Sequence, residues 1–168
     1  IQTNKDDKVV MLYTNSVEEQ YGFIQKAKDR GYDVLHIDGP LAPHWIANAE
    51  QALENVMFAR VDSDSLDKLI QKEEEIPSKL SKEDEEVLKP IFESVVNGEK
   101  YKIQFESMSA DDAPIIITQP EFIRRMMEQQ KMGGAGFFGA FPDTFNVLVN
   151  SNHAKIGEVL SAKSVQAK

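Results

Sequence analysis

Short apolar runs alternate with amphipathic stretches along the first third of the chain. The runs have the length of strands, and the stretches between them place apolar residues at helical spacing. Ser16 with Glu19 fits a capping box at the start of the first helix, and Gly31 fits its end. The pattern predicts strand, helix, strand, helix and strand at residues 8–14, 16–31, 32–37, 43–55 and 57–62. This order predicts a small parallel sheet with right-handed crossovers, a βαβαβ unit of the α/β class.

The rest of the chain has a different pattern, which is typical of an α+β domain. After an outgoing helix at residues 63–75, helices are predicted at 81–96, 120–132 and 153–163, and strands at 101–107, 113–118 and 144–150. The apolar run 113–118 predicts a buried strand. Residues 72–86 hold seven acids, three lysines and a proline. We interpret this segment as a boundary between a domain at 1–75 and one at 76–168, although a solvated surface would have the same composition.

The stretch 126–141, MMEQQKMGGAGFFGAF, gathers three of the six methionines and three of the nine phenylalanines around four glycines. Because glycine leaves the backbone flexible, it does not hold these aromatic side chains in fixed positions. A flexible, methionine-rich apolar surface is typical of proteins that bind many partners, because unbranched thioethers repack against different shapes. The alternative is that the phenylalanines cover a helix of this chain or of a second copy.

The sequence offers no catalytic constellation. Residues 134–139 match G-x-G-x-x-G, but a helix precedes them and a strand follows, which is the reverse of a dinucleotide site. The chain has no cysteine, and its three histidines lack metal-ligand spacing. A small doubly wound enzyme would bind its ligand at the carboxyl ends of the strands, near Thr14 and Asp38, but no phosphate-cradling loop follows the first strand.

The formal net charge of −9 argues against nucleic acid and anionic membranes as partners, because both attract basic proteins. No apolar run approaches the roughly 20 residues of a membrane-spanning helix.

Several segments of the chain, taken in order, match segments of one known protein family. They are Tyr13-Thr14 at the end of a strand, KDRGYDVLHIDGPL ahead of Trp45, FARVDSDSLDKLI, APIIITQ, Arg124-Arg125-Met126 and FNVLVNSNH. With them, nearly the whole chain resembles the ninety-kilodalton heat-shock chaperone family in its bacterial HtpG form. Residues 72–86 match least.

The resemblance implies part of a homodimeric, ATP-driven cytoplasmic chaperone of the stress response, which binds and remodels partly folded client proteins. The chain resembles the small α/β part of the family's middle domain and the start of its C-terminal domain, without the last helices through which the family dimerises. The family's nucleotide pocket, with ATP and Mg, and its catalytic arginine loop belong to parts that this chain does not match. We therefore expect no cofactor, no metal and no enzymatic activity in this chain.

The resemblance also implies contact positions for clients. Trp45 and Asn48 match positions at which the bacterial family contacts clients, although His44 replaces the acidic residue often found beside that tryptophan. Three further residues fall on the family's amphipathic client-facing helix, and the glycine-rich loop adds two phenylalanines. The candidate client-binding residues are Trp45, Asn48, Phe122, Met126, Met127, Phe137 and Phe138. The alternative is an architectural module, in which the same helix and loop pack against a second protomer and contact no client.

Overall fold

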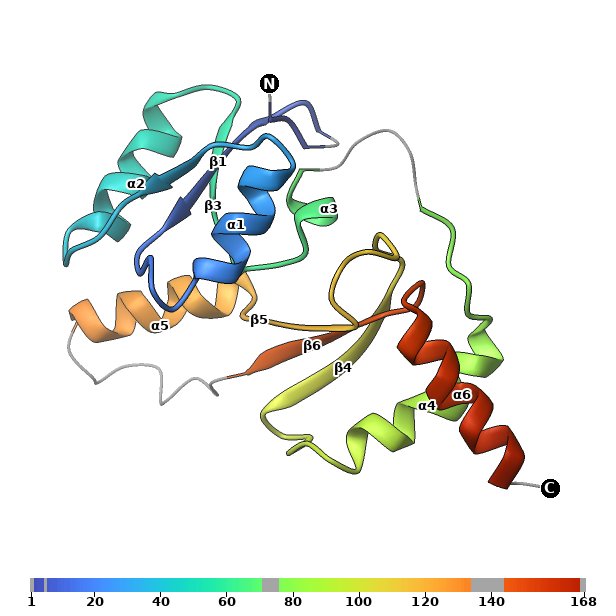
Figure 1. Cartoon of the computed structure of the whole chain (residues 1–168). Helices are drawn as coiled ribbons and strands as arrows, with labels where there is room; N and C mark the ends of the chain where they lie inside the picture. Colours follow the sequence, from blue (N-terminus) through green and yellow to red (C-terminus); the bar gives the residue numbers. More distant parts are fainter. Residues whose placement is uncertain (1, 5, 71–75, 134–143, 167–168) are drawn as a thin grey trace. The chain divides into compact units, whose positions relative to one another are not determined.

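The computed structural model describes residues 2–4, 6–70, 76–133 and 144–166. Contacts between Cα atoms divide the chain into two compact units. The first unit comprises Ile1–Glu73 and Gln119–Phe141, and the second comprises Glu74–Thr118 and Pro142–Lys168. Each unit is built on a three-stranded sheet of its own (Figure 1).

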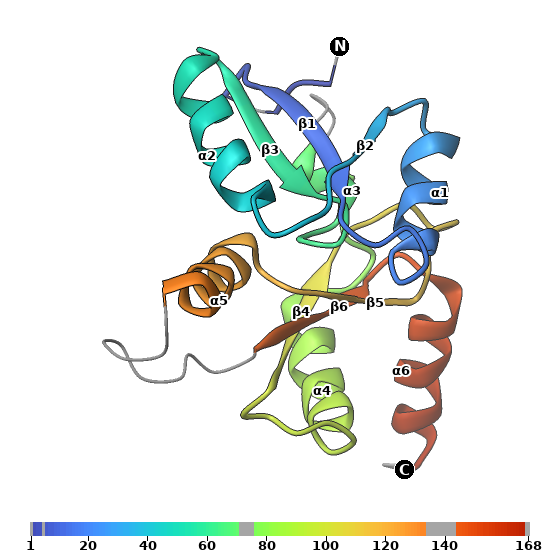
Figure 2. The ribbon, with the colours of Figure 1, turned by 90° about the vertical axis from the view of Figure 1, so that its left-hand side faces the viewer.

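The sheet of the first unit is entirely parallel. Its strands are β1 (Val9–Thr14), β2 (Val34–His36) and β3 (Val56–Arg60), and they lie in the order β2-β1-β3. The connections contain α1 (Tyr21–Asp29) and α2 (Ala42–Ala52). Because β2 and β3 flank β1, right-handed crossovers place the two helices on opposite faces of the sheet, as Figure 2 shows.

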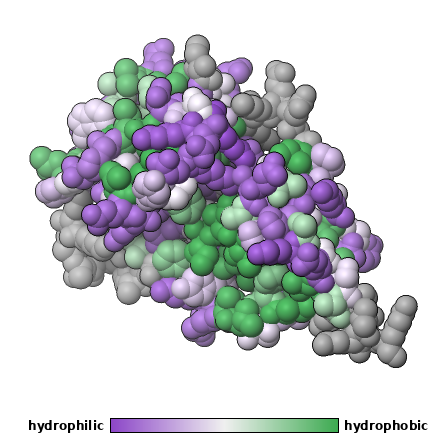
Figure 3. All heavy atoms as spheres, in the orientation of Figure 1, coloured by the Kyte–Doolittle hydropathy of each residue, from purple (hydrophilic) through white to green (hydrophobic). Residues whose placement is uncertain are grey.

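Apolar side chains that alternate along the strands fill a core on each face. On the α1 side, this core consists of Val10, Leu12, Ile24, Ala27, Ala59, Val61, Leu66 and Ile70. Leu66 begins α3 (Leu66–Leu69), a single turn, and Ile70 follows it. On the α2 side, Ile46 packs with Tyr13 and Phe58. The outer surface around α1 is largely hydrophilic (Figure 3), so this helix has the usual arrangement of a buried apolar stripe and a polar outer face.

The second unit has a mixed sheet, and helices cover one of its faces. Its strands are β4 (Tyr101–Glu106), β5 (Ile115–Thr118) and β6 (Phe145–Asn150), in the order β4-β6-β5. β6 pairs parallel with β4 and antiparallel with β5. The helices α4 (Lys82–Glu93) and α6 (Ala154–Gln166) contribute Leu88 and Ile156 to a core with Val147 and Val149.

The predicted fold class, a βαβαβ unit followed by an α+β domain, is confirmed, and three details differ. α1 begins at Tyr21 rather than directly after Ser16, whose hydroxyl accepts the Glu19 N–H in a turn ahead of the helix. The described part of the outgoing helix is the single turn α3. The prediction that the strand at 113–118 is buried is wrong for Ile115 and Ile117, which are exposed at the edge of the sheet.

The helix α5 (Glu121–Gly133) belongs to the first unit by its contacts, although the sequence analysis assigned it to the domain at 76–168. It follows β5 of the second unit directly in sequence. The first unit is therefore discontinuous along the chain, and contacts between distant residues must hold α5 to it.

Candidate functional site

α5 packs on the first unit through its charged face. Arg124 is 3% exposed, and Glu121 and Arg125 are half-buried beside it. Phe122, on the same turn, is 68% exposed. An amphipathic helix ordinarily buries its apolar stripe and leaves its charges in water. In the described part of α5, this arrangement is partly inverted.

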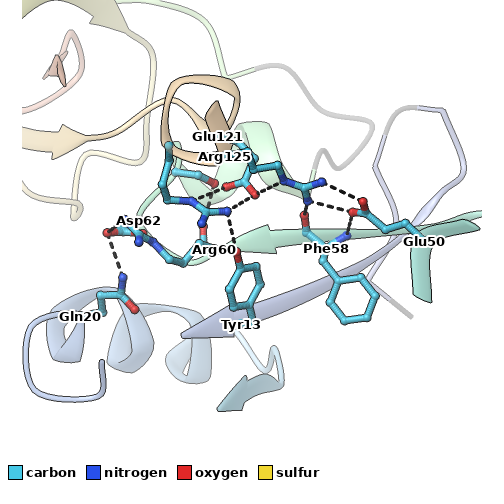
Figure 4. A network of polar contacts seen from close by, with 10 residues as sticks. Tyr13, Gln20, Glu50, Phe58, Arg60, Asp62, Glu121 and Arg125 are labelled. Carbon is cyan, nitrogen blue, oxygen red and sulfur yellow. Dashed lines mark hydrogen bonds and ion pairs between the residues drawn. The ribbon is translucent and has the colours of Figure 1, made fainter. Parts of the chain in front are cut away.

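Arg125 joins three elements of the first unit (Figure 4). Its two Nη atoms donate to the two carboxylate oxygens of Glu50 on α2, at 2.8 and 2.9 Å. Nη2 also donates to the Phe58 carbonyl on β3, at 2.9 Å, and Nε donates to Glu121 Oε1 at 2.7 Å. Paired, planar donors of this kind fix both the distance and the direction of an ion pair.

The charges at this junction stabilise one another. Burial alone would raise the pKa of Glu50, but hydrogen bonds from Arg125 and the Phe58 N–H outweigh it and hold that pKa below its ordinary value. The hydrogen bond to Glu50 raises the pKa of Arg125 above its ordinary value, against the effect of desolvation and with a contribution from Glu121. Both groups are therefore charged at neutral pH.

Arg124 attaches α5 to the central strand. Its Nη2 donates to Tyr13 Oη, at 2.5 Å, and to the Glu121 carboxylate. Its guanidinium carbon lies 5.6 Å from the centre of the Tyr13 ring. A buried arginine needs such partners, because an unpaired buried charge is strongly unfavourable.

A second group of polar contacts lies where the strands of the first unit end. Gln20 accepts from the Thr14 hydroxyl, and its Nε2 donates to Asp62 Oδ2 at 3.0 Å. Asp62 also pairs with Arg60, and its carbonyl accepts the Gln119 N–H just ahead of α5. A doubly wound enzyme binds its ligand at this edge of the sheet. Here these side chains bind one another, and the Asp62 carbonyl binds the segment that leads into α5.

The candidate residues on α2 point outward. Trp45 is 53% exposed, and Asn48 is exposed as well. The Trp45 ring meets the Phe58 ring edge-on, with the ring centres 5.6 Å apart. One side of the tryptophan is thus supported by the sheet, and much of it remains open to water.

The candidate residues on α5 differ in exposure. Phe122 is largely exposed, whereas Met126 and Met127 are half-buried. Gln119 Nε2 lies 3.7 Å from the Met127 sulfur. The structure brings α2 and α5 into contact within one unit through Glu50 and Arg125. Phe137 and Phe138 lie outside the described residues.

The residues that hold α5 were not among the candidates predicted from the sequence. The available signal was a pair of adjacent arginines with a glutamate three and four positions earlier, a spacing that places Glu121 beside both Arg124 and Arg125. Their partners Tyr13 and Glu50 had no signal of their own, because they are distant in sequence.

The described residues also bear on metal binding and on membrane insertion. Among the described residues, no group of three or more His, Asp or Glu side chains could hold a metal ion. No helix in the described parts of the chain combines the length and the apolar character needed to cross a membrane.

No known family profile matches the chain. Individual proteins, however, are similar to it over nearly its whole length. The chain is 41% identical over 167 residues to "Chaperone protein HtpG" of Porphyromonas gingivalis, which covers 97% of this chain and 24% of that protein. It is 37% identical over 164 residues to the HtpG of Bacteroides fragilis and over 163 residues to that of Bacteroides thetaiotaomicron, and covers 24% of each. This chain is homologous to a segment of HtpG.

The resemblance stated from the sequence is therefore confirmed. The chain spans about a quarter of the length of the HtpG relatives that it matches. Within this chain, α2, α5 and the charged contacts between them form the candidate site.

Proposed function

We propose that this HtpG segment is a client-contact part of an ATP-dependent, homodimeric chaperone of the cytoplasm. The contact surface consists of exposed and half-buried side chains of α2 and α5, and it binds apolar stretches of partly folded proteins. Its residues are Trp45, Asn48, Phe122, Met126 and Met127, with Phe137 and Phe138 as a further contribution from the adjoining loop.

The observation that supports this most directly is the orientation of α5. The buried side chain of Arg124 and the ion pair of Arg125 hold the helix, so its attachment does not depend on burying Phe122. Burying a phenylalanine side chain stabilises a protein by about 1.5–3 kcal/mol. A helix that leaves this stabilisation unused can gain it when it binds an apolar segment of another protein.

The chemistry of the surface suits variable clients. Trp45 supplies a broad aromatic face, and Asn48 can donate and accept hydrogen bonds. Met126 and Met127 can change conformation at small cost. A surface of this kind selects for apolar character rather than for one shape. The names of the relatives, all chaperones, support the same function. In this proposal, ATP hydrolysis belongs to other parts of the whole protein.

The experiment uses Trp45 as a fluorescent reporter, because it is the only tryptophan in the chain. An intrinsically unfolded client is titrated into the wild-type chain, into Phe122→Ser and into Phe137→Ser/Phe138→Ser. We expect the wild type to bind and both variants to bind several-fold more weakly. Val95→Ser is the matched control, because Val95 is 78% exposed but lies in the second unit.

Equal affinities for Phe122→Ser and Val95→Ser would contradict the proposal. If the chain binds no client, and its mass rises with concentration in a way that the phenylalanine substitutions abolish, the surface is an assembly element instead. That outcome would support the architectural alternative.

A further inference from the structure

Phe58 connects the two helices of the proposed surface. β3 lies at the edge of its sheet, and Phe58 directs both of its backbone groups to side chains of other elements. Its N–H donates to Glu50 Oε1 at 2.7 Å, and its carbonyl accepts from Arg125 Nη2 at 2.9 Å. The Glu50–Arg125 pair thus occupies the outward N–H and carbonyl of Phe58 on an edge strand, which would otherwise face water.

The same residue supports the exposed tryptophan. The Phe58 ring packs against the Trp45 ring, as described above. A continuous series of contacts therefore runs from α5 through Arg125, Glu50 and Phe58 to Trp45 (Figure 4 shows all but the tryptophan). Each link joins atoms whose geometry is fixed by hydrogen bonds or by ring packing.

We propose that Glu50 and Arg125 are positioning residues that hold α5 in one register against α2, so that Trp45 and Phe122 belong to one client-contact surface. This inference rests on the proposed function. The two residues act through the placement of the helices and do not themselves touch the client.

The geometry favours positioning over simple attraction. Two unlike charges on the surface of a protein attract each other over many arrangements, and such pairs contribute little. Arg125 instead donates to two other elements, to Glu50 on α2 and to Phe58 on β3, and Glu121 of its own helix holds its Nε; its donors lie in one plane. A sliding or turning of α5 by one residue would break the contacts to Glu50 and Phe58 together, because both lie outside the helix.

In the part of α5 whose side chains the structure describes, residues 121–127, the apolar contacts are less able to fix its register. Phe122 faces outward, and Met127 has a flexible side chain. Arg124 anchors the helix to Tyr13, and the Gln119 N–H just ahead of the helix donates to the Asp62 carbonyl, but neither contact reaches α2. The pair on Arg125 supplies the fixed point on α2.

The test is a double-mutant cycle in the whole chain, with client affinity and amide hydrogen exchange as readouts. The variants are Glu50→Gln, Arg125→Gln and the double variant. We expect each single substitution to lower the affinity about fivefold and the double variant to bind no more weakly than the weaker single variant, because the two residues act as one pair. Exchange of the α5 amides should quicken, while exchange in β1 should not change.

Two further variants sharpen the test. Arg125→Lys keeps the charge but loses the planar fork, so it should bind as weakly as Arg125→Gln. Glu93→Gln is the control for charge: it removes one carboxylate from the exposed Lys89–Glu93 pair of the second unit and should bind as the wild type does. If Arg125→Gln loosens the first unit as a whole, Glu50→Gln and Arg125→Lys still decide the question.

Three outcomes would overturn the inference. They are additive losses in the cycle, full affinity in Arg125→Lys, or unchanged affinity in variants whose α5 exchanges faster. If Phe122→Ser weakens binding and the Glu50 and Arg125 variants do not, only this inference fails. If Phe122→Ser has no effect, the proposed function fails first.

Discussion

At the scale of single residues, two arginines fix the position of α5 in the first unit. Arg125 and Arg124 are adjacent in sequence, yet one joins α5 to α2 and β3, and the other joins it to β1. Glu121 binds both. A lysine at either position would keep the charge but could not direct several coplanar donors at once.

The Glu50–Arg125 pair predicts a pH dependence of stability. The pKa of Glu50 in the folded chain lies below its ordinary value of 4.5, so its ionised form binds Arg125 and stabilises the folded state at neutral pH. This contribution is complete above the pKa of the unfolded chain and is lost as the pH falls through the lower pKa of the folded chain. The unfolding free energies of the wild type and Glu50→Gln should therefore differ most at neutral pH and converge in acid.

Urea titrations of both proteins at a series of pH values measure this difference. The comparison of the two proteins isolates the effect of the Glu50 charge and of the contacts that depend on it. A difference that stays constant from neutral pH to well below 4.5 would show that the charge of Glu50 does not stabilise the fold.

At the scale of elements, patterns between residues close in sequence were sufficient to predict most helices and strands. β1 is an apolar run, and α4 begins where the sequence predicts it, because Ser81 and Asp84 form a capping box from residues three apart. The hydrogen bond from the Ser81 N–H lowers the pKa of Asp84, so this box is charged at neutral pH. Such elements depend on neighbours in sequence, and sequence patterns report on those neighbours.

The orientation of α5 could not be predicted in this way. Its spacing of apolar residues predicts a helix with an apolar face, but the spacing does not say which face is buried. That depends on Tyr13 and Glu50, which lie 111 and 75 positions from their arginine partners. The exposure of Ile117 on β5 has the same cause, because an apolar strand is buried only where another element covers it.

The attachment of α5 to β1 predicts the effect of Tyr13→Phe. The substitution removes the hydroxyl that Arg124 binds and keeps the ring. A hydrogen bond to a charged group contributes about 1.5–3 kcal/mol, so the variant should lose a stability of that order and the amides of α5 should exchange faster. Tyr21→Phe is the matched control, because it deletes a hydroxyl from an exposed tyrosine at the start of α1. Equal unfolding midpoints for the two variants would contradict the role of Tyr13 as an anchor.

At the scale of the whole molecule, the first unit is assembled from two distant parts of the chain. Residues up to 70 contain the parallel sheet and both of its cores, whereas α5 lies beyond the strands β4 and β5 of the second unit. If the first unit is a cooperative structure, removing α5 should weaken it even though every strand of its sheet remains.

A fragment of residues 1–75 tests this directly. We expect it to fold around its own cores but to unfold at a lower temperature than the first unit does within the whole chain, because Tyr13 and Glu50 lose their arginine partners. Joining residues 119–133 to the fragment by a flexible Gly/Ser linker should restore much of the lost stability, since a short linker holds the helix at about millimolar effective concentration. The same fusion with Arg124→Gln and Arg125→Gln is the control, and it should unfold as the bare fragment does. Trp45 emission reports the transition in all of these proteins, because Trp45 packs against Phe58 of the sheet. A bare fragment as stable as the fusion would mean that α5 does not contribute to the stability of the first unit. The helix could then detach from this unit when it binds a client.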